Sequence, residues 1–226
     1  MAPRAARPLE ALVRHVRSRL ARRQQPAAAQ AFAEATPPSS PALDRVREFR
    51  QPDDTSCGAS SLVLSRMLHD PAYGSWILDD PARWGPEVKA MHHRVSRWRD
   101  HDGRPQCPWP RVVGTSPWAA AGQMGGGSGR SGRGTRYRWR ILDPDDLAAG
   151  FELIVAAARS GHTVPLYAGN AVRPAHVVLV VSAEPDRLRV YEPSAGRIVR
   201  VGREAFVSGA LDLGGWSVPW FAVLPR

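Results

Sequence analysis

The chain has little cysteine, almost no lysine and no long apolar run. Cys57 and Cys107 are its two cysteines, too few for the disulfide framework that stabilises small secreted domains. No apolar stretch approaches the roughly 18 residues that cross a bilayer. Arginines interrupt residues 1–25, which excludes the apolar core of a secretory signal. We therefore predict two free thiols in a reducing compartment and a cytoplasmic location.

Lys89 is the single lysine among 31 basic residues, so the formal net charge of +10 rests on arginine. An arginine-rich composition with abundant alanine, proline and glycine is typical of a high-GC bacterial genome. The positive charge is dispersed along the sequence, and the main domain contains no stripe of basic residues interleaved with aromatics. The sequence therefore predicts no specific nucleic-acid partner.

Composition divides the chain into an arm and one domain. Residues 1–42 form a basic arm, in which an amphipathic helix precedes a flexible linker at 26–42. Residues 43–226 have the length of a single domain. The helix of the arm is either solvated or makes a weak contact with an anionic membrane surface or a partner through residues 9–23. Its apolar residues share one face: Leu9, Leu12, Val13, Val16 and Leu20.

A glutamine six residues before a cysteine marks the main candidate site, in the segment Gln51-Pro-Asp-Asp-Thr-Ser-Cys57-Gly58. A thiolate that attacks a carbonyl creates an oxyanion. The backbone N–H of Cys57 and the side-chain amide of Gln51 are suitable donors for it. Apolar spacing from Leu64 onward predicts a helix directly after the cysteine, and the dipole at its N-terminus favours a thiolate. Because polar residues surround Cys57, we expect it to lie outside the core.

A histidine and an acid in the second half complete the set. His176 begins an apolar run, and after a turn at 184–187 a return strand ends in Glu192. An antiparallel pair of this kind brings Glu192 back beside His176. We interpret His176 as a general base and Glu192 as the acid that orients it, with Asp186 in the turn as the weaker alternative.

The order of glutamine, cysteine, histidine and acid resembles the papain-like cysteine hydrolases, in particular C39-like peptidases of the actinobacterial type. In that group a glutamine–cysteine–glycine box is followed by a histidine on one strand and an Asp-Pro that closes the next. The resemblance covers about residues 49–72 and 164–224. The chain departs from the pattern at the acid, which is glutamate. The resemblance implies a papain-like α+β fold with the catalytic residues Cys57, His176, Glu192 and Gln51.

Periodicity elsewhere agrees with helices before a sheet, which is the α+β arrangement. One helix is predicted over 86–99 and another over 143–161, started by Asp143-Pro144 and ended by Gly161. In this arrangement Cys57 and His176 face each other across the helix–sheet cleft. Alternating segments predict the antiparallel strands 163–167, 176–181, 188–191, 197–201 and 220–224.

Trp109 and Trp118 lie in a loop rich in proline and glycine. Their aromatic faces suit the wall of a peptide-sized groove, and a packed corner is an equal alternative. Together with Gly58, beside the candidate nucleophile, they are the candidate substrate-binding residues. The glycine-rich loop 125–134 is a candidate mobile segment over the site.

Zinc binding is the one metal hypothesis that the sequence raises. Its candidate ligands are His92, His93, His101 and Cys107, and their spacing fits no closed ligand pattern. We therefore predict no metal and no cofactor.

The leading hypothesis is a monomeric cysteine hydrolase that cleaves an amide or peptide bond. One alternative keeps the same residues but passes the acyl group to an amine or deamidates a side chain, as transglutaminase-like and deamidase-like enzymes do. Another is a binding module that retains the fold without activity. Leader peptides, peptidoglycan cross-links and side-chain amides all remain possible substrates.

Overall fold

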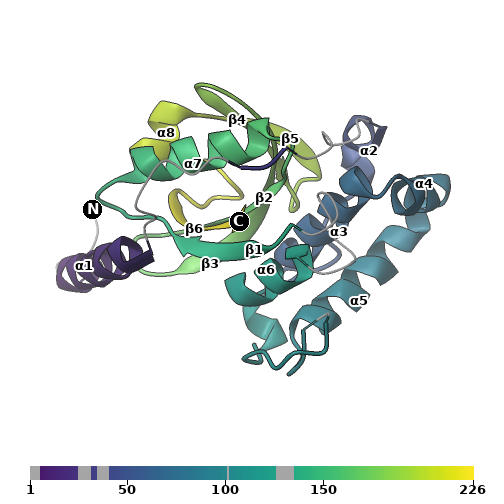
Figure 1. Ribbon diagram of the computed structural model, residues 1–226, viewed down its shortest axis with the longest axis horizontal. Coiled ribbons are helices and arrows are strands. Elements are labelled where there is room, and N and C mark those ends of the chain that lie inside the picture. Colours follow the sequence, from purple (N-terminus) through teal and green to yellow (C-terminus); the bar gives the residue numbers. More distant parts are fainter. Residues whose placement is uncertain (1–5, 25–31, 35–40, 101, 126–134) are drawn as a thin grey trace.

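The structure is a computed structural model that describes residues 6–24, 32–34, 41–100, 102–125 and 135–226. It combines helices with one antiparallel sheet, so the fold class is α+β, as the sequence predicted (Figure 1). Short 3-10 turns lie at 46–48, 81–83 and 111–113. The helices are α1 (Ala6–Gln24), α2 (Pro41–Asp44), α3 (Cys57–His69), α4 (Pro71–Asp79), α5 (Trp84–Val95), α6 (Pro117–Gly125), α7 (Leu147–Arg159) and α8 (Arg203–Val207).

The sheet has the strand order β1-β6-β2-β3-β4-β5, and neighbouring strands run antiparallel. The strands after β1 correspond to the segments predicted from alternation. They extend further than the prediction because their ends are less regular than their apolar centres. The strands are β1 (Tyr137–Ile141), β2 (Val164–Gly169), β3 (Pro174–Glu184), β4 (Arg187–Glu192), β5 (Arg197–Gly202) and β6 (Val218–Pro225).

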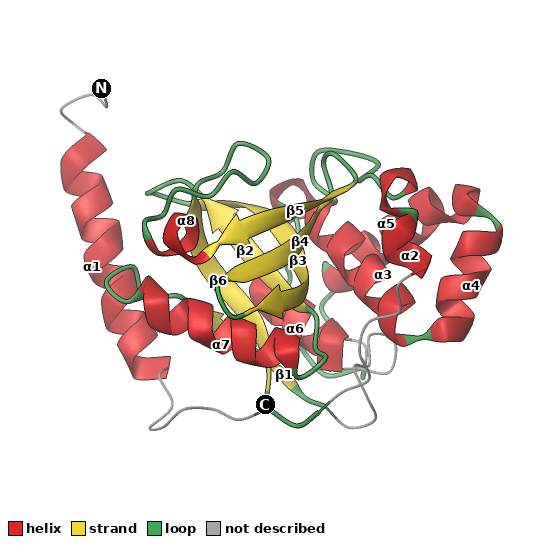
Figure 2. Ribbon diagram, turned by 90° about the horizontal axis from the view of Figure 1, so that it is seen from above, coloured by secondary structure: helices red, strands yellow, loops and turns green. Residues whose placement is uncertain are grey.

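Both faces of the sheet are covered, so its central strand β3 is apolar on both sides. Val177 and Leu179 belong to the core that α3, α5 and α6 share with the sheet. Val178 and Val180 belong to a second core beneath α7 and α8. Figure 2 shows these two sets of helices on either side of the strands. Successive side chains of a strand point to opposite faces, which is why one uninterrupted apolar run serves two cores.

Capping residues fix where the helices begin and end. α3 ends at His69, and Asp70 then caps α4 by accepting a hydrogen bond from the Tyr73 backbone N–H. The sequence analysis did not predict this second helix. α7 begins at Leu147 rather than at the predicted Asp143, because Asp146 is the residue that caps it.

Some elements were missed and some predictions lie outside the described residues. β1 and α6 were not predicted, since the first is short and the second begins with a proline, next to a glycine-rich stretch. The predicted linker at 26–42 is described only at 32–34 and 41–42, and the loop predicted at 125–134 is described only at Gly125.

The helix of the arm packs against the domain. Arg17, Ser18 and Ala21 of α1 are buried, and α1 contacts the C-terminal end of β1 and lies at one end of the molecule (Figures 1 and 2). A solvated helix, one of the alternatives raised by the sequence, is therefore wrong for this face of α1. None of the helices in the described ranges combines the length and the apolarity needed to span a bilayer.

Candidate active site

Cys57 is the first residue of α3, with Ser56 at the N-cap position. The position agrees with the sequence analysis, and the dipole of a 13-residue helix points its positive end at the sulfur. The expectation that Cys57 lies outside the core is wrong, because only 5% of it is exposed. The loop before it folds under the helix and places its polar atoms in internal hydrogen bonds.

Asp53 organises that loop. Its carboxylate accepts hydrogen bonds from the backbone N–H and the hydroxyl of Thr55, at 3.0 and 2.9 Å. Its backbone carbonyl accepts bonds from the Ser56 hydroxyl and the Gln51 amide. Burial opposes the charge of Asp53, but these bonds and the nearby His92 hold its pKa below the ordinary value. The residues before Cys57 are thus positioned by one aspartate.

His176 and Glu192 form a buried pair at the end of the sheet. The Nε2 atom of His176 lies 2.8 Å from Oε1 of Glu192, and both residues are buried. The alternative acid, Asp186, lies in the turn at the other end of the hairpin, exposed and beside Arg187. The structure therefore brings together the histidine and the glutamate that the sequence paired.

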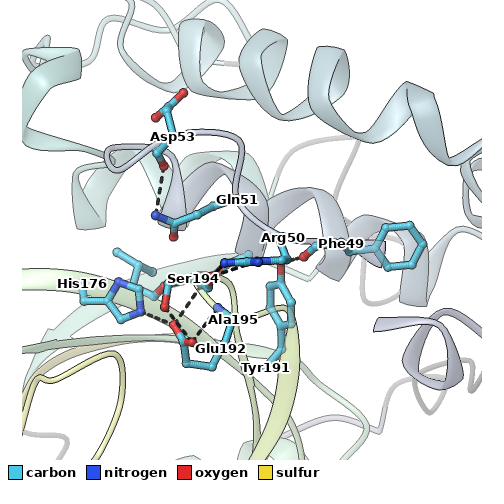
Figure 3. Close-up of polar contacts among 11 residues, drawn as sticks. Phe49, Arg50, Gln51, Asp53, His176, Tyr191, Glu192, Ser194 and Ala195 are labelled. Atoms are coloured by element: carbon cyan, nitrogen blue, oxygen red, sulfur yellow. Dashed lines mark hydrogen bonds and ion pairs between the residues drawn. The ribbon is translucent and has the colours of Figure 1, made fainter. Parts of the chain in front are cut away.

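Four donors hold the carboxylate of Glu192. Besides the imidazole, the Ser194 backbone N–H, the Ser194 hydroxyl and the Ala195 backbone N–H bind it at 3.0, 2.8 and 2.9 Å (Figure 3). The turn after β4 thus curls back over the side chain of Glu192. A carboxylate that accepts so many bonds is ionised and fixed in position.

The protonation states follow from these contacts. Burial alone would lower the pKa of His176, but its interactions with Cys57 and Glu192 raise it to about 9. Burial alone would raise the pKa of Glu192, but the bonds from His176 and Ser194 lower it to about 2. Both shifts favour the protonated imidazole and the ionised carboxylate at neutral pH. Because Nε2 of His176 is hydrogen-bonded to Glu192, Nδ1 is the ring nitrogen available to interact with Cys57.

The segment that carries Gln51 is joined to the turn that carries Glu192. The Gln51 backbone N–H donates to the Pro193 carbonyl at 2.8 Å. Arg50 donates to the Ser194 carbonyl, and the Tyr191 hydroxyl donates to the Phe49 carbonyl (Figure 3). These bonds connect residues more than 140 positions apart, so they hold the cysteine loop against the acid turn.

The Gln51 amide is used within the loop in this structure. Its Nε2 donates to the Asp53 carbonyl at 2.9 Å, and its Oε1 is buried without a partner. An amide nitrogen carries two hydrogens, so one N–H is left over. The role of Gln51 as an oxyanion donor stays a prediction.

Gly58 has a packing role that the sequence did not reveal. A Cβ at this position would lie 2.6 Å from the Cβ and 2.7 Å from the Oγ1 of Thr115. The loop around Thr115 therefore presses directly on the first turn of α3. The Thr115 hydroxyl is buried without a hydrogen-bond partner.

The two tryptophans contact each other. The rings of Trp109 and Trp118 meet edge to face with centroids 5.1 Å apart, and the Trp118 N–H donates to the Cys107 carbonyl. Trp118 also borders a cavity of about 500 Å³, whose lining includes neither Cys57 nor His176. Their role in binding substrate stays a prediction.

Two further residues near the site were missed by the sequence analysis. Gly214 has φ of +60°, and a Cβ there would lie 3.2 Å from Nε2 of His176 and 3.4 Å from Oε1 of Glu192. Tyr167 of β2 is buried, and its hydroxyl has no partner. Burial raises the pKa of Tyr167 well above its ordinary value, and the electrostatic influence of Cys57 adds to it. Gly214 stands between Leu213 and Gly215, and Tyr167 stands in an apolar strand, so neither position indicated these contacts in the sequence.

The candidate zinc ligands differ in their surroundings. His101 lies outside the described residues, His92 is buried, and Cys107 is exposed. Across the ranges that the structure describes, no three side chains among histidine, cysteine, aspartate and glutamate are gathered for a metal ion.

Comparison with solved structures gives several matches, and one of them is a protease. The chain is similar to the crystal structure of a double glycine motif protease from an AMS/PCAT transporter in complex with the leader peptide. The TM-score is 0.40 and the identity 11%, over 88% of this chain and 97% of that chain. A likeness at this TM-score carries no argument about function. No model of a protein family matches the chain, and no curated protein matches its sequence.

Proposed function

We propose that the protein is a papain-like cysteine hydrolase that cleaves an amide or peptide bond with Cys57, His176 and Glu192. One observation supports the proposal most: a buried imidazole bound to an ionised glutamate also interacts with a cysteine at a helix N-terminus. Burying two ionisable groups is costly unless they serve each other or a reaction. The catalytic unit of this proposal is the domain 43–226.

The acylation step follows from the protonation states. The thiolate of Cys57 attacks the substrate carbonyl carbon, a C–S bond forms, and the carbonyl electrons move to the oxygen. The Cys57 backbone N–H and the free N–H of Gln51 stabilise that oxyanion. His176, already protonated at neutral pH, gives its proton to the leaving amine as the C–N bond breaks.

Deacylation uses the same histidine in the opposite direction. His176, now neutral, removes a proton from water, and the hydroxide attacks the thioester carbon. The C–S bond breaks, the carboxylic product leaves, and the thiolate–imidazolium pair is restored. Glu192 keeps the ring oriented and stabilises its positive charge through both steps.

The test begins with the reactivity of the two cysteines. We expect a small electrophile such as iodoacetamide to alkylate Cys57 faster than Cys107 at pH about 6, where an ordinary thiol is almost fully protonated. Cys107 is the internal control because it is exposed, whereas Cys57 is buried. Peptide mapping by mass spectrometry locates the label. Labelling confined to Cys107 would count against a catalytic cysteine.

Turnover is measured next on a library of peptide and muropeptide amides. Cys57→Ser is expected to lower turnover by at least roughly three orders of magnitude, since a serine hydroxyl does not ionise in a site arranged for a thiolate. The matched variant Cys107→Ser keeps wild-type turnover. Incorporation of ¹⁸O from labelled water into the product separates hydrolysis from transfer to an amine.

A further inference from the structure

α1 is attached to the domain by its polar side. Arg17, one of its buried residues, donates to the backbone carbonyls of Leu142 and Pro219 at 3.1 and 2.8 Å. Its guanidinium also lies 4.0 Å from the ring centroid of Trp220. Burial lowers the pKa of Arg17 to about 10, so the side chain stays charged at neutral pH. An arginine thus occupies the place that an apolar side chain fills in an ordinary amphipathic helix.

Two more polar residues of α1 complete this attachment. The Ser18 hydroxyl lies 2.6 Å from a carboxylate oxygen of Asp143 and 2.6 Å from one of Asp145. Arg14 donates to Asp145 at 2.8 Å. These contacts fix the rotation of the helix about its axis, because each of them lies on the same side.

The apolar side of α1 consequently faces solvent. Its residues recur at i, i+3, i+7 and i+11, which is one face of a helix. They are also the residues of α1 among the large exposed hydrophobics of the described chain. We call them the outer stripe: Leu9 (48% exposed), Leu12 (59%), Val16 (46%) and Leu20 (43%).

The charges beside the outer stripe are positive. Arg19 follows Val16 by three residues, and Arg23 follows Leu20 by three, so both lie on the same side as the stripe. Both are exposed, and Arg23 also borders the cavity beside Trp118. Glu10 is the single acidic residue of α1 and is partly buried. A second copy of the stripe would therefore bring arginine against arginine, whereas an anionic surface meets both the apolar and the charged groups.

We propose that α1 binds the surface of an anionic lipid bilayer, lying in the plane of the interface with the outer stripe inserted and Arg19 and Arg23 at the phosphates. An apolar stripe flanked by arginines is the pattern that such helices use. α1 lies at the end of the molecule opposite α3 (Figures 1 and 2), so a membrane bound to α1 does not cover the helix that carries Cys57. The inference does not depend on the proposed hydrolase activity.

The test is co-sedimentation of the full chain with lipid vesicles at low salt. Vesicles of equimolar phosphatidylglycerol and phosphatidylcholine are expected to bind the protein at least about ten-fold more strongly than phosphatidylcholine alone. Binding is expected to fall as salt screens the arginines. The double variant Leu12→Ser/Leu20→Ser and the double variant Arg19→Glu/Arg23→Glu should each reduce binding to the anionic vesicles by at least about ten-fold.

Matched controls separate the outer stripe from general hydrophobicity and charge. Trp98→Ser removes another exposed apolar side chain (75% exposed), and Arg97→Glu/Arg200→Glu makes the same charge change at exposed sites outside α1. Both controls are expected to bind like the wild type. Equal binding by the controls and the α1 variants would overturn the proposal. A lipid-independent dimer that Leu12→Ser/Leu20→Ser abolishes, with no vesicle binding, would overturn it in favour of a self-interface.

Discussion

Glu192 reaches His176 along a diagonal of the β3–β4 ladder rather than straight across it. Leu179 pairs with Tyr191, and continuing this register sets Glu192 opposite Val178, two residues from His176. The register is shifted by an irregularity between Val180 and Ser182. Diagonal neighbours in a sheet are about 7–8 Å apart, compared with about 5 Å for direct partners. The long arm of a glutamate spans that distance and still ends 2.8 Å from the imidazole.

The first prediction concerns the length of this side chain. Glu192→Asp is expected to lower turnover by about ten-fold or more, comparable to Glu192→Gln, because the shorter carboxylate no longer meets the ring across the diagonal. The resemblance to C39-like peptidases, in which the acid is an aspartate, would favour the opposite result. The test compares the turnover of Glu192→Asp and Glu192→Gln with that of the wild type, using the substrate found in the amide screen. Wild-type activity in Glu192→Asp would show that the diagonal geometry is unimportant.

The second prediction concerns stability against pH. The pKa of His176 is raised from 6.5 to about 9, so its contribution is complete below 6.5 and is lost as pH rises through 9. The pKa of Glu192 is lowered from 4.5 to about 2, so its contribution is complete above 4.5 and is lost as pH falls through 2. The pair therefore stabilises the fold fully between pH 4.5 and 6.5. Urea unfolding midpoints measured across the pH range follow the loss of stability on the acid side (the acid limb) and on the alkaline side (the alkaline limb).

Glu192→Gln serves as the control for that measurement, since a neutral amide removes the ion pair. Its alkaline limb should move to lower pH, because the imidazole loses the carboxylate that keeps it protonated. An unchanged alkaline limb would mean that other groups set the pH dependence.

The third prediction concerns the contact between Gly58 and Thr115. Gly58→Ala inserts a methyl group 2.6 Å from the Thr115 Cβ, so the first turn of α3 must shift, and Cys57 with it. We expect a loss of about 1–3 kcal/mol in the free energy of unfolding and slower alkylation of Cys57. Adding Thr115→Gly removes the opposing side chain and should restore part of both. A Gly58→Ala protein that alkylates and unfolds like the wild type would contradict the contact.

The fourth prediction concerns the unpartnered hydroxyl of Tyr167. Removing a buried hydroxyl that makes no hydrogen bond relieves a desolvation cost, so Tyr167→Phe should be neutral or stabilising by up to about 1 kcal/mol. Thermal unfolding checks this directly, with Tyr191→Phe as the contrasting variant. Tyr191 donates to the Phe49 carbonyl, and losing that bond should destabilise the fold. Clear destabilisation by Tyr167→Phe would reveal a partner for its hydroxyl in solution.

Local patterns in the sequence determined much of this molecule. The helix that begins at Cys57 and five of the strands were predictable from the spacing of apolar residues, since helices and strands of this kind depend on neighbouring residues. The interval between Gln51 and Cys57 likewise indicated the candidate site. The pairing of His176 with Glu192 was also predictable, because a hairpin brings its two ends together.

Only the tertiary structure decided the remaining features, because each depends on residues far apart in the chain. The burial of Cys57, the contact of Thr115 with Gly58 and the placement of Gly214 against the ion pair arise where separate loops meet. The orientation of α1 is the strongest case. Its amphipathic pattern does not tell which face meets the domain. Carbonyls and carboxylates on the domain match Arg17 and Ser18, so the polar face is bound and the outer stripe is exposed.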